Sequence, residues 1–304
     1  MLVTWRSIGE IFRSGSFRPL VVQFDALIRT ALAEDLGRGG DLTTDLVFKA
    51  SHTSQCVLKA RHDGVLSGLA PALWVWASLD DTLEVALDFQ DGDFLPSGAK
   101  VLEIRGRTRP ILTGERTVLN ILGHLSGIAT RTRRLVQMLE GTNASLCDTR
   151  KTLPGLRTLQ KYAVTCGGGF NHRFGLDDCV LIKDNHIAAC GSLTEAVKRV
   201  RAVIGHTVKI EVEVDSLDQL DEALSTGVEI VLLDNFSAQE MAEAVTRRNA
   251  LNRNNADGTK SPLLEASGGV DEKTIRILAE TGVDLVSMGA LTHSVTNFDF
   301  GLDH

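Results

Sequence analysis

The chain has 304 residues, of which 43% are apolar and 23% are charged, and its mean hydropathy is close to zero. This length and balance exclude a disordered tail, a collagen-like repeat and a membrane bundle, and they allow one large core or two smaller ones. The 32 basic and 39 acidic residues give a net charge of −7, which excludes the global positive field of a non-specific nucleic-acid binder.

The cysteines and the first twenty residues indicate where the protein works. The five cysteines form no Cys-x-x-Cys pair and are odd in number, which argues against a zinc ribbon or a disulfide framework and fits a reducing cytoplasm. Residues 1–20 contain three arginines and one acid, Glu10, but lack the continuous apolar segment of a secretory signal. No apolar run reaches the roughly eighteen residues of a membrane helix. We expect a cytoplasmic protein in which residues 1–20 form a loose extension, with a transit peptide as the less favoured alternative.

The segment after this extension predicts an α+β layer. Apolar residues at helical spacing predict a helix over 21–36, which Gly37 ends. Three strand-like segments follow, separated by turn signals: 55–60, 83–89 and 100–104. A short helix over 71–79 interrupts them, so the pattern indicates a mostly antiparallel sheet with helices. A long helical segment, 110–139, leads out of this layer, and we expect Gly114, Gly123 and Gly127 to weaken it.

The second half of the chain alternates short strands with helices. Six β-branched segments predict the strands: 145–148, 179–183, 208–214, 230–234, 263–267 and 284–288. Strands separated by helices pair in parallel through right-handed crossovers. Capping boxes at Ser192, Ser216 and Ser237 mark the starts of three helices, and Asp271 can cap a fourth. The spacing fits a β/α barrel or an open doubly wound sheet.

Polar residues and glycines follow the carboxyl end of every predicted strand. These segments are Asp148–Lys151, Lys183–His186, Glu213–Asp215, Asp234–Phe236, Ser267–Gly269 and Met288–Ala290. The ends of parallel strands meet at one rim, which is where such folds bind ligands. A solvated charge or a glycine turn explains any one of these segments alone, but their convergence favours a binding site.

The residue types at this rim indicate an anionic ligand. Up to five positive groups gather there: Arg150, Lys151, His172, Arg173 and Lys183. They favour a polyanionic or multiply carboxylated substrate. Glu213 and Asp234 are hard oxygen ligands that suit Mg²⁺ bound mainly through substrate phosphates. The glycines of Ser267–Gly269 and Gly289-Ala290 let backbone N–H groups approach a phosphate.

Six motifs in order make the chain resemble a known family. They are Asp148-Thr-Arg-Lys-Thr-Leu-Pro-Gly-Leu-Arg157, Gly167-Gly-Gly-Phe-Asn-His-Arg173, Leu181-Ile-Lys-Asp-Asn-His186, Glu211-Val-Glu-Val-Asp215, Leu233-Asp-Asn-Phe236 and Glu265-Ala-Ser-Gly-Gly269. The chain resembles the quinolinate phosphoribosyltransferases, also called nicotinate-nucleotide pyrophosphorylases (carboxylating), over roughly residues 21–302. The resemblance implies an N-terminal α/β sandwich over 21–126, packed on an incomplete parallel β/α barrel over 127–304. It also implies that the C-terminal tail returns to the N-terminal domain.

The resemblance also implies residue roles. The quinolinate carboxylates would face Arg116, Arg150, His172, Arg173 and Lys183, with Arg116 donated by the other chain of a head-to-tail homodimer, which could assemble further. Phosphoribosyl pyrophosphate would contact Lys151, Glu213, Asp234, Ser267, Gly268, Gly269, Gly289, Ala290 and His293. Mg²⁺ would lie near Glu213 and Asp234, held directly or through water or ribose hydroxyls.

The implied reaction is phosphoribosyl transfer to quinolinate with decarboxylation, which gives nicotinate mononucleotide, pyrophosphate and CO₂ in de novo NAD biosynthesis. One alternative is a related phosphoribosyltransferase with another substrate on the same scaffold. A second is a barrel aldolase that forms a Schiff base on Lys183. A third is a binding module without catalysis, which explains the charged strand ends poorly. We expect neither nucleic acid nor membrane as a partner.

Overall fold

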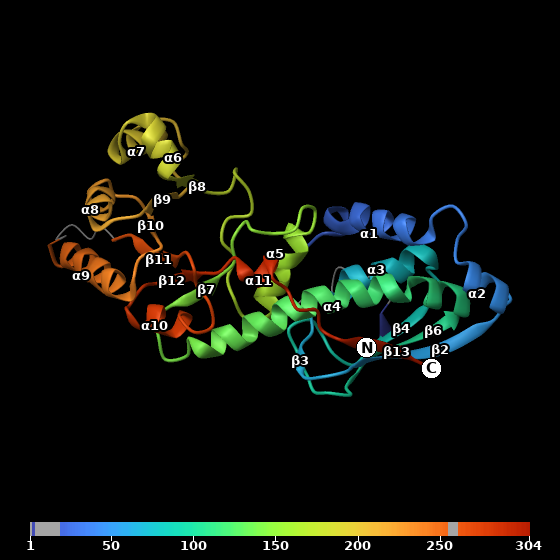
Figure 1. The fold of residues 1–304 in the computed structure, drawn as a ribbon. Coiled ribbons are helices and arrows are strands. Elements are labelled where there is room, and N and C mark those ends of the chain that lie inside the picture. Colours follow the sequence, from blue (N-terminus) through green and yellow to red (C-terminus); the bar gives the residue numbers. More distant parts are fainter. Residues whose placement is uncertain (1, 4–18, 255–260) are drawn as a thin grey trace. The chain divides into compact units, whose positions relative to one another are not determined.

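The chain folds into two units, which Figure 1 shows coloured along the sequence. The structure, a computed structural model, describes residues 2–3, 19–254 and 261–304. Unit 1 contains the described residues up to Arg134, together with Thr152–Gly168 and Leu291–His304. Unit 2 contains the described residues of Leu135–Lys151 and Gly169–Ala290. Most of the expected N-terminal extension, residues 1 and 4–18, lies outside the described residues.

An antiparallel five-stranded sheet forms the base of unit 1. Its strands, in spatial order, are β1 (Leu2–Val3), β4 (Glu84–Leu87), β6 (Lys100–Arg107), β2 (Thr53–Ala60) and β13 (Phe300–Asp303). The predicted strands at 55–60, 83–89 and 100–104 correspond to β2, β4 and β6, so the expected antiparallel sheet is confirmed. Two further short strands, β3 (Gly64–Val65) and β5 (Phe94–Leu95), pair separately.

The helices of unit 1 pack through large aromatic and apolar side chains. They are α1 (Val21–Leu36), α2 (Leu42–Val47), α3 (Leu69–Leu79), α4 (Thr108–Met138, whose last four residues belong to unit 2), α5 (Arg157–Cys166) and α11 (Ala290–His293, whose first residue belongs to unit 2). Trp76 of α3 is fully buried and donates from its indole nitrogen to the Ile111 carbonyl of α4. Trp74 donates to Asp25 of α1 at 2.8 Å, which joins α1 to α3. These contacts make the three helices one layer of the unit 1 core.

The glycines of α4 do not weaken the helix as expected. The helix runs unbroken from Thr108 to Met138. A Cβ atom on Gly123 or Gly127 would collide with the backbone carbonyl of Phe298 or Thr296. The C-terminal segment therefore lies directly on the helix, and the Phe298 N–H donates to the Gly123 carbonyl at 2.8 Å. Close packing against this segment requires glycine at these positions and offsets the low helix propensity.

Six parallel strands form the sheet of unit 2. Their spatial order is β7 (Ser145–Cys147), β12 (Leu285–Ser287), β11 (Leu263–Ser267), β10 (Ile230–Asp234), β9 (Ile210–Val214) and β8 (Val180–Ile182). The first strand in the chain thus pairs with the last, as in a barrel. The first and second strands, β7 and β8, occupy the two ends of this order instead of pairing. The sheet is therefore an incomplete barrel, and the predicted parallel fold is confirmed.

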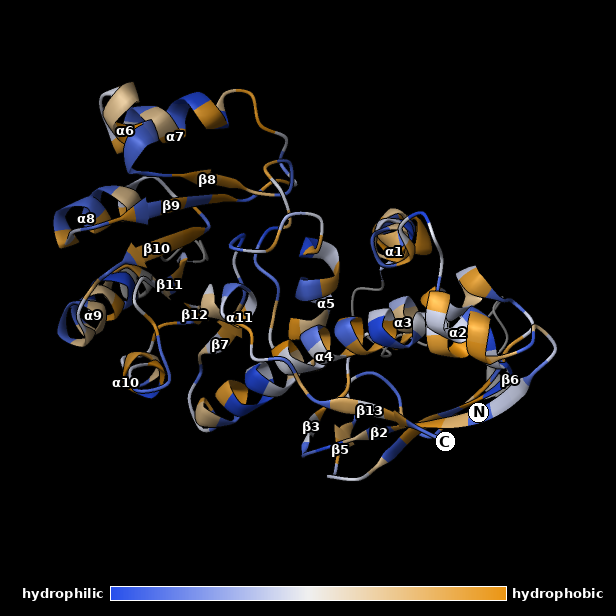
Figure 2. Ribbon diagram, turned by 45° about the vertical axis from the view of Figure 1, so that its right-hand side comes forward, coloured by the Kyte–Doolittle hydropathy of each residue, from blue (hydrophilic) through white to orange (hydrophobic). Residues whose placement is uncertain are grey.

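The helices of unit 2 begin largely where the capping residues predict. They are α6 (Asp184–Cys190), α7 (Leu193–Arg201), α8 (Leu217–Ser225), α9 (Ala238–Asn254) and α10 (Ile275–Glu280). The hydroxyls of Ser192, Ser216 and Ser237 each accept the backbone N–H three residues later. Asp271 accepts from the N–H groups of Lys273 and Thr274, in the turn before α10. The strands and helices of this unit differ in hydropathy. Figure 2 shows that β8 and β10 are mostly hydrophobic, whereas α8 is mostly hydrophilic.

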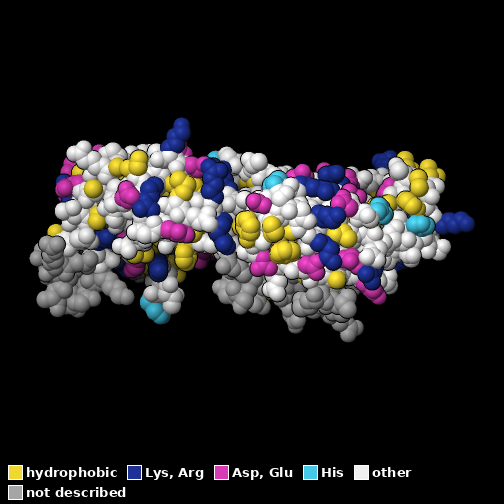
Figure 3. Space-filling model, turned by 90° about the horizontal axis from the view of Figure 1, so that it is seen from below, with side chains coloured by type: hydrophobic (Ala, Val, Ile, Leu, Met, Phe, Trp, Pro, Cys, Tyr) yellow, Lys and Arg dark blue, Asp and Glu magenta, His cyan; other side chains and the backbone are white. Residues whose placement is uncertain are grey.

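On the face drawn in Figure 3, basic and acidic side chains are interspersed. This distribution accords with the modest net charge of −7. Within the described residues, no helix combines the length and the apolar character needed to cross a membrane.

Candidate active site

Strand register places charged side chains inside unit 2. Glu213 of β9 and Glu265 of β11 both pair with Leu232 of β10, so the three side chains lie on one face of the sheet. All three line one pocket. Asp234 and Ser267, two residues further along, also pair with each other and line the same pocket. Alternation along the strands therefore stacks carboxylates and a hydroxyl toward the carboxyl ends of the strands.

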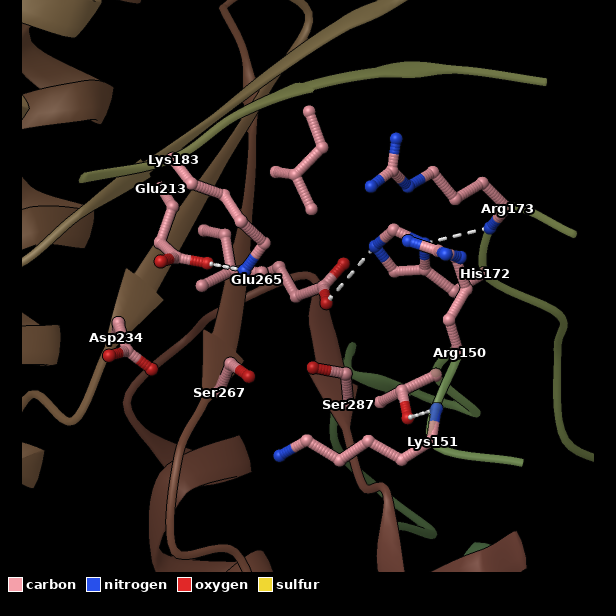
Figure 4. Close-up of a pocket in the computed structure, with 13 residues that line it drawn as sticks. Arg150, Lys151, His172, Arg173, Lys183, Glu213, Asp234, Glu265, Ser267 and Ser287 are labelled. Carbon is pink, nitrogen blue, oxygen red and sulfur yellow. Dashed lines mark hydrogen bonds and ion pairs between the residues drawn. The ribbon is translucent and has the colours of Figure 1, made fainter. Parts of the chain in front are cut away.

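The pocket has a volume of about 400 Å³. Figure 4 shows its lining: Thr149, Arg150, Lys151, His172, Arg173, Leu181, Lys183, Glu213, Leu232, Asp234, Glu265, Ser267 and Ser287. Eight of the residues expected from the sequence are among these: Arg150, Lys151, His172, Arg173, Lys183, Glu213, Asp234 and Ser267. Four of the eight are arginines or lysines, which can bind the charged groups of an anion.

Two of the arginines enter the pocket from loops. Arg150 follows β7, and its Nε atom is buried without a hydrogen-bond partner among the described residues. Arg173 lies in the loop before β8, and its guanidinium donates to the Cys179 carbonyl at 2.8 Å. An unsatisfied buried donor is costly, and a ligand carboxylate could accept from it.

Lys183 is already paired with an acid. Its ammonium group lies 2.5 Å from a Glu213 carboxylate oxygen. The lysine side chain is 44% exposed, so the pair faces the open pocket and is not sealed inside the protein. The ion pair links the group expected to bind quinolinate with a group expected to bind the ribose. The aldolase alternative needs a lysine amine that can approach a carbonyl carbon, whereas the Lys183 side-chain nitrogen here contacts a carboxylate.

A buried aspartate shapes the loop before β8. Asp148 is fully buried and accepts the Asn171 side-chain amide at 2.6 Å and the His172 backbone N–H at 2.9 Å. Phe170, in the same loop, forms an isolated parallel bridge with Cys147 at the end of β7. The loop that supplies two basic side chains is therefore fixed to β7 at its base.

Two buried glutamates lie beneath the basic groups. Glu211 and Glu265 are almost completely buried, and an oxygen of each has no hydrogen-bond partner among the described residues. Burial and the neighbouring Glu211 carboxylate raise the pKa of Glu265 to about 7. The ring Nε2 atom of His172 lies 3.1 Å from Glu211 and 3.6 Å from Glu265. Glu265 and the imidazole line the pocket, and Glu211 lies with them on a second cavity beside it.

The remaining expected residues lie elsewhere. Gly268 and Gly269 follow β11 at positive φ and line a neighbouring hollow with Asn235 and Phe236. Two more lie between β12 and the short helix α11: Gly289 is the second residue after the strand, and Ala290 begins the helix. Both Arg116, which is exposed on α4, and His293, whose ring contacts Ser294, belong to unit 1. These six are therefore not among the residues that line the pocket.

Alternation could have revealed the residues that were missed. The five other lining residues are Thr149, Leu181, Leu232, Glu265 and Ser287. Glu211 is two residues from Glu213, and Glu265 is two residues from Ser267, so period two places each pair on one side of its strand. A charged residue two positions before a predicted site residue in the same strand is therefore the sequence signal that could have identified Glu211 and Glu265.

Comparison with known proteins identifies relatives along most of the chain. Residues 41–126 match the model of the N-terminal domain of quinolinate phosphoribosyl transferase, and residues 128–303 match that of its C-terminal domain. The nicotinate-nucleotide pyrophosphorylase [carboxylating] of Mycobacterium leprae is 46% identical over 286 residues, which cover 92% of this chain and 98% of the relative. The probable nicotinate-nucleotide pyrophosphorylase [carboxylating] of Bacillus subtilis is 41% identical over 283 residues, which cover 93% of this chain and 93% of the relative. The nicotinate-nucleotide pyrophosphorylase structure from Francisella tularensis superposes with a TM-score of 0.87 at 37% identity, covering 94% of this chain and 97% of that one.

Proposed function

The chain belongs to the quinolinate phosphoribosyl transferase family, and we propose that it transfers phosphoribose from phosphoribosyl pyrophosphate to quinolinate with loss of CO₂. The products are nicotinate mononucleotide, pyrophosphate and CO₂, so the enzyme is a pentosyltransferase of NAD biosynthesis. The observation that best supports this proposal is the strand-end pocket, which is lined by four arginines and lysines and by three carboxylates. Such a pocket suits two anionic substrates, quinolinate and phosphoribosyl pyrophosphate, with the ribose of the second placed between the basic and acidic side chains.

The basic side of the pocket suits quinolinate. Arg150, Arg173 and Lys183 can bind its two carboxylates, and His172 lines the same side. Arg116 is a further group that we assign to quinolinate. Because it is exposed in unit 1 while the pocket residues all belong to unit 2, we assign it to the site of the partner chain in a homodimer.

The acidic side suits phosphoribosyl pyrophosphate. Glu213 and Asp234 can accept hydrogen bonds from the ribose hydroxyls, and Lys151 can bind the pyrophosphate. The Ser267–Gly269 turn and Gly289-Ala290 are assigned to the 5′-phosphate because each follows a strand end beside the pocket. His293 is assigned to a phosphate group on the family resemblance alone.

The donor set at Glu213 and Asp234 fits Mg²⁺ held mainly by substrate. Glu213 and Asp234 are two of the three carboxylates that line the pocket, but Lys183 already occupies one oxygen of Glu213, so these two residues offer too few oxygens for a full coordination shell. Mg²⁺ would therefore be bound through one or two carboxylates together with pyrophosphate, ribose or water. When bound, it supplies positive charge that stabilises the departing pyrophosphate.

The protein groups account for the first chemical step by binding and electrostatics. The pyridine nitrogen of quinolinate attacks the anomeric carbon, and the bond from that carbon to the pyrophosphate oxygen breaks. Positive charge develops on the ribose, where Glu213 and Asp234 can stabilise it, while Lys151 stabilises the charge of the leaving group. No protein nucleophile is needed.

Ribosyl transfer prepares the ring for decarboxylation. The alkylated ring nitrogen is cationic, and its charge stabilises the electron pair that stays on the ring carbon when the adjacent carboxylate departs as CO₂. A proton then replaces that carboxylate on the ring carbon. Arg150 and Arg173 would hold the remaining carboxylate and keep the ring in place.

We place this reaction in the cytoplasm. The odd number of cysteines and the lack of a Cys-x-x-Cys pair support a reducing compartment. The partners that we propose are the two substrates and a second copy of the chain.

The proposed function predicts a coupled release of two products. Purified protein with quinolinate, phosphoribosyl pyrophosphate and Mg²⁺ should release CO₂ and pyrophosphate in equal amounts, and chelation of the metal should stop both. The measurement is an end-point assay of both products from one reaction. Well-folded protein that releases neither would overturn the assignment, and turnover with nicotinate in place of quinolinate would favour the related phosphoribosyltransferase.

Lys183 tests the division of the pocket. Lys183→Ala should weaken quinolinate binding about 10- to 100-fold, because a charge-assisted contact is lost, while phosphoribosyl pyrophosphate binding changes only a few-fold. Titration of each substrate by calorimetry measures both effects. Lys198→Ala, an exposed lysine on α7, is the control. If the variant binds both substrates equally more weakly, the ion pair between Lys183 and Glu213 supports the binding of both substrates.

A further inference from the structure

Both ring nitrogens of His172 are engaged by the protein. Nδ1 lies 2.7 Å from the backbone nitrogen of Arg173, which donates to it. Nε2 faces the buried carboxylates of Glu211 and Glu265. Figure 4 shows the ring between Glu265 and the Arg173 backbone, with an interaction marked on each side. The imidazole thus connects two buried carboxylates to the backbone of a basic residue.

These contacts define which nitrogen bears the proton. A backbone N–H can only donate, so Nδ1 of His172 is an acceptor and has no hydrogen. The ring proton of the neutral imidazole then lies on Nε2, where Glu211 accepts it. The ring is only 12% exposed, so water does not compete strongly for either contact.

The same contacts argue against a metal ion at this cluster. His172, Glu211 and Glu265 offer ligand atoms within 4.8 Å of one another, a spacing that a metal could bridge. A metal-binding histidine uses the lone pair of one nitrogen and donates a proton from the other. Here the nitrogen facing the carboxylates is the protonated one, and the other accepts. The hydrogen-bond directions therefore favour a positioning role.

We propose that His172 is a positioning residue for Arg173, held in one tautomer by the buried Glu211 carboxylate. Glu211 accepts the Nε2 proton, which leaves Nδ1 free to accept the Arg173 N–H and fix the backbone there. The Arg173 guanidinium, at the far end of that residue, donates to the Cys179 carbonyl and is fixed by it. Together the two contacts hold Arg173 where it can bind a substrate carboxylate. This inference rests on the proposed function, since it assigns His172 an indirect part in quinolinate binding.

A double-mutant cycle separates this positioning role from direct contact. Arg173→Ala should weaken quinolinate binding about 100-fold and His172→Ala about 10-fold, and the double variant should bind about as weakly as Arg173→Ala alone. If His172 contacts quinolinate itself, the two losses should multiply to about 1,000-fold. Calorimetric titration with quinolinate measures all four proteins, and His206→Ala, an exposed histidine of the same unit, is the control.

Substitutions of Glu211 test the hydrogen bond behind the positioning. Glu211→Gln retains an oxygen that can accept the Nε2 proton, and its amide can donate to the unsatisfied oxygen of Glu265. We expect quinolinate binding within about three-fold of wild type for this variant and about 10-fold weaker binding for Glu211→Leu. Phosphoribosyl pyrophosphate binding should be unchanged in both. Nitrogen-15 spectra of the imidazole should show the Nε2-protonated form of His172 in the wild type.

The outcomes distinguish this inference from the proposed function. Wild-type protein that does not bind quinolinate contradicts the proposed function. Wild-type binding with multiplicative losses in the cycle contradicts the positioning role alone. A doubly protonated or Nδ1-protonated His172 in the spectra also overturns it. If Glu211→Leu does not fold, the cycle and the Glu211→Gln variant still decide the matter.

Discussion

Mixing Arg116→Ala and Lys183→Ala proteins should restore activity that neither has alone. In the proposed head-to-tail dimer, each site combines Lys183 of one chain with Arg116 of the other. A hybrid dimer then has one site with both defects and one site with neither. Random exchange makes about half of the dimers hybrids, so activity should recover to at most about a quarter of the wild-type value. The assay measures CO₂ release near the wild-type KM for quinolinate, where both single variants should be nearly inactive.

The control for this experiment is subunit exchange itself. Two differently tagged wild-type samples, mixed in the same way, should yield dimers that contain both tags. If exchange occurs and activity does not return, Arg116 acts within its own chain or has only a structural role. If each variant is active alone, neither residue binds quinolinate strongly. Loss of a charge-assisted contact of this kind should cost about 2–5 kcal/mol of binding free energy when the contact is buried.

Replacement of Arg150 should reduce activity without reducing stability. Arg150→Met should lower kcat/KM for quinolinate about 100- to 1,000-fold, because a guanidinium that binds a carboxylate is lost. The same change removes a buried Nε atom that has no hydrogen-bond partner among the described residues, while it retains much of the aliphatic side chain. The melting temperature should therefore stay constant or rise slightly. Steady-state kinetics and thermal unfolding of the same preparation measure the two effects.

Arg150→Lys provides the matched comparison. A lysine restores the charge but lacks the planar pair of donors, so we expect only partial recovery of kcat/KM. Full recovery would mean that charge alone matters at this position. A fall in melting temperature parallel to the loss of activity would mean that Arg150 chiefly supports the fold.

Local sequence signals account for much of the fold. The capping serines at 192, 216 and 237 begin helices because their hydroxyls satisfy free N–H groups, a requirement that depends only on nearby residues. Strands such as 230–234 and 263–267 were predicted to the residue because both are short apolar runs with polar ends. Gly123 and Gly127 of α4 misled the prediction, since their role depends on a segment more than 160 residues further along the chain. Long-range packing of this kind has no local signal.

The site divides in a similar way. Basic residues at strand ends, such as Arg150 and Lys183, could be predicted because parallel strands bring their ends to one rim. The Lys183–Glu213 ion pair could not, because it depends on which strands are neighbours and on side-chain conformation. Glu265 was not predicted as a site residue because the prediction used the residues at strand ends, and Glu265 lies inside β11. Its burial, and the raised pKa that follows, can be recognised only when the inner face of the sheet is known.

The pairing of the first barrel strand with the last also affects how the protein can be made. Ser145 of β7 pairs with Leu285 of β12, and β2 of unit 1 pairs with β13 near the C-terminus. During synthesis, neither sheet can be completed until almost the whole chain has left the ribosome. Contacts between residues so distant in sequence slow folding, and exposed strand edges meanwhile favour aggregation. Truncation by even the last few residues should therefore lower the yield of folded protein far more than their small contribution to the core would indicate.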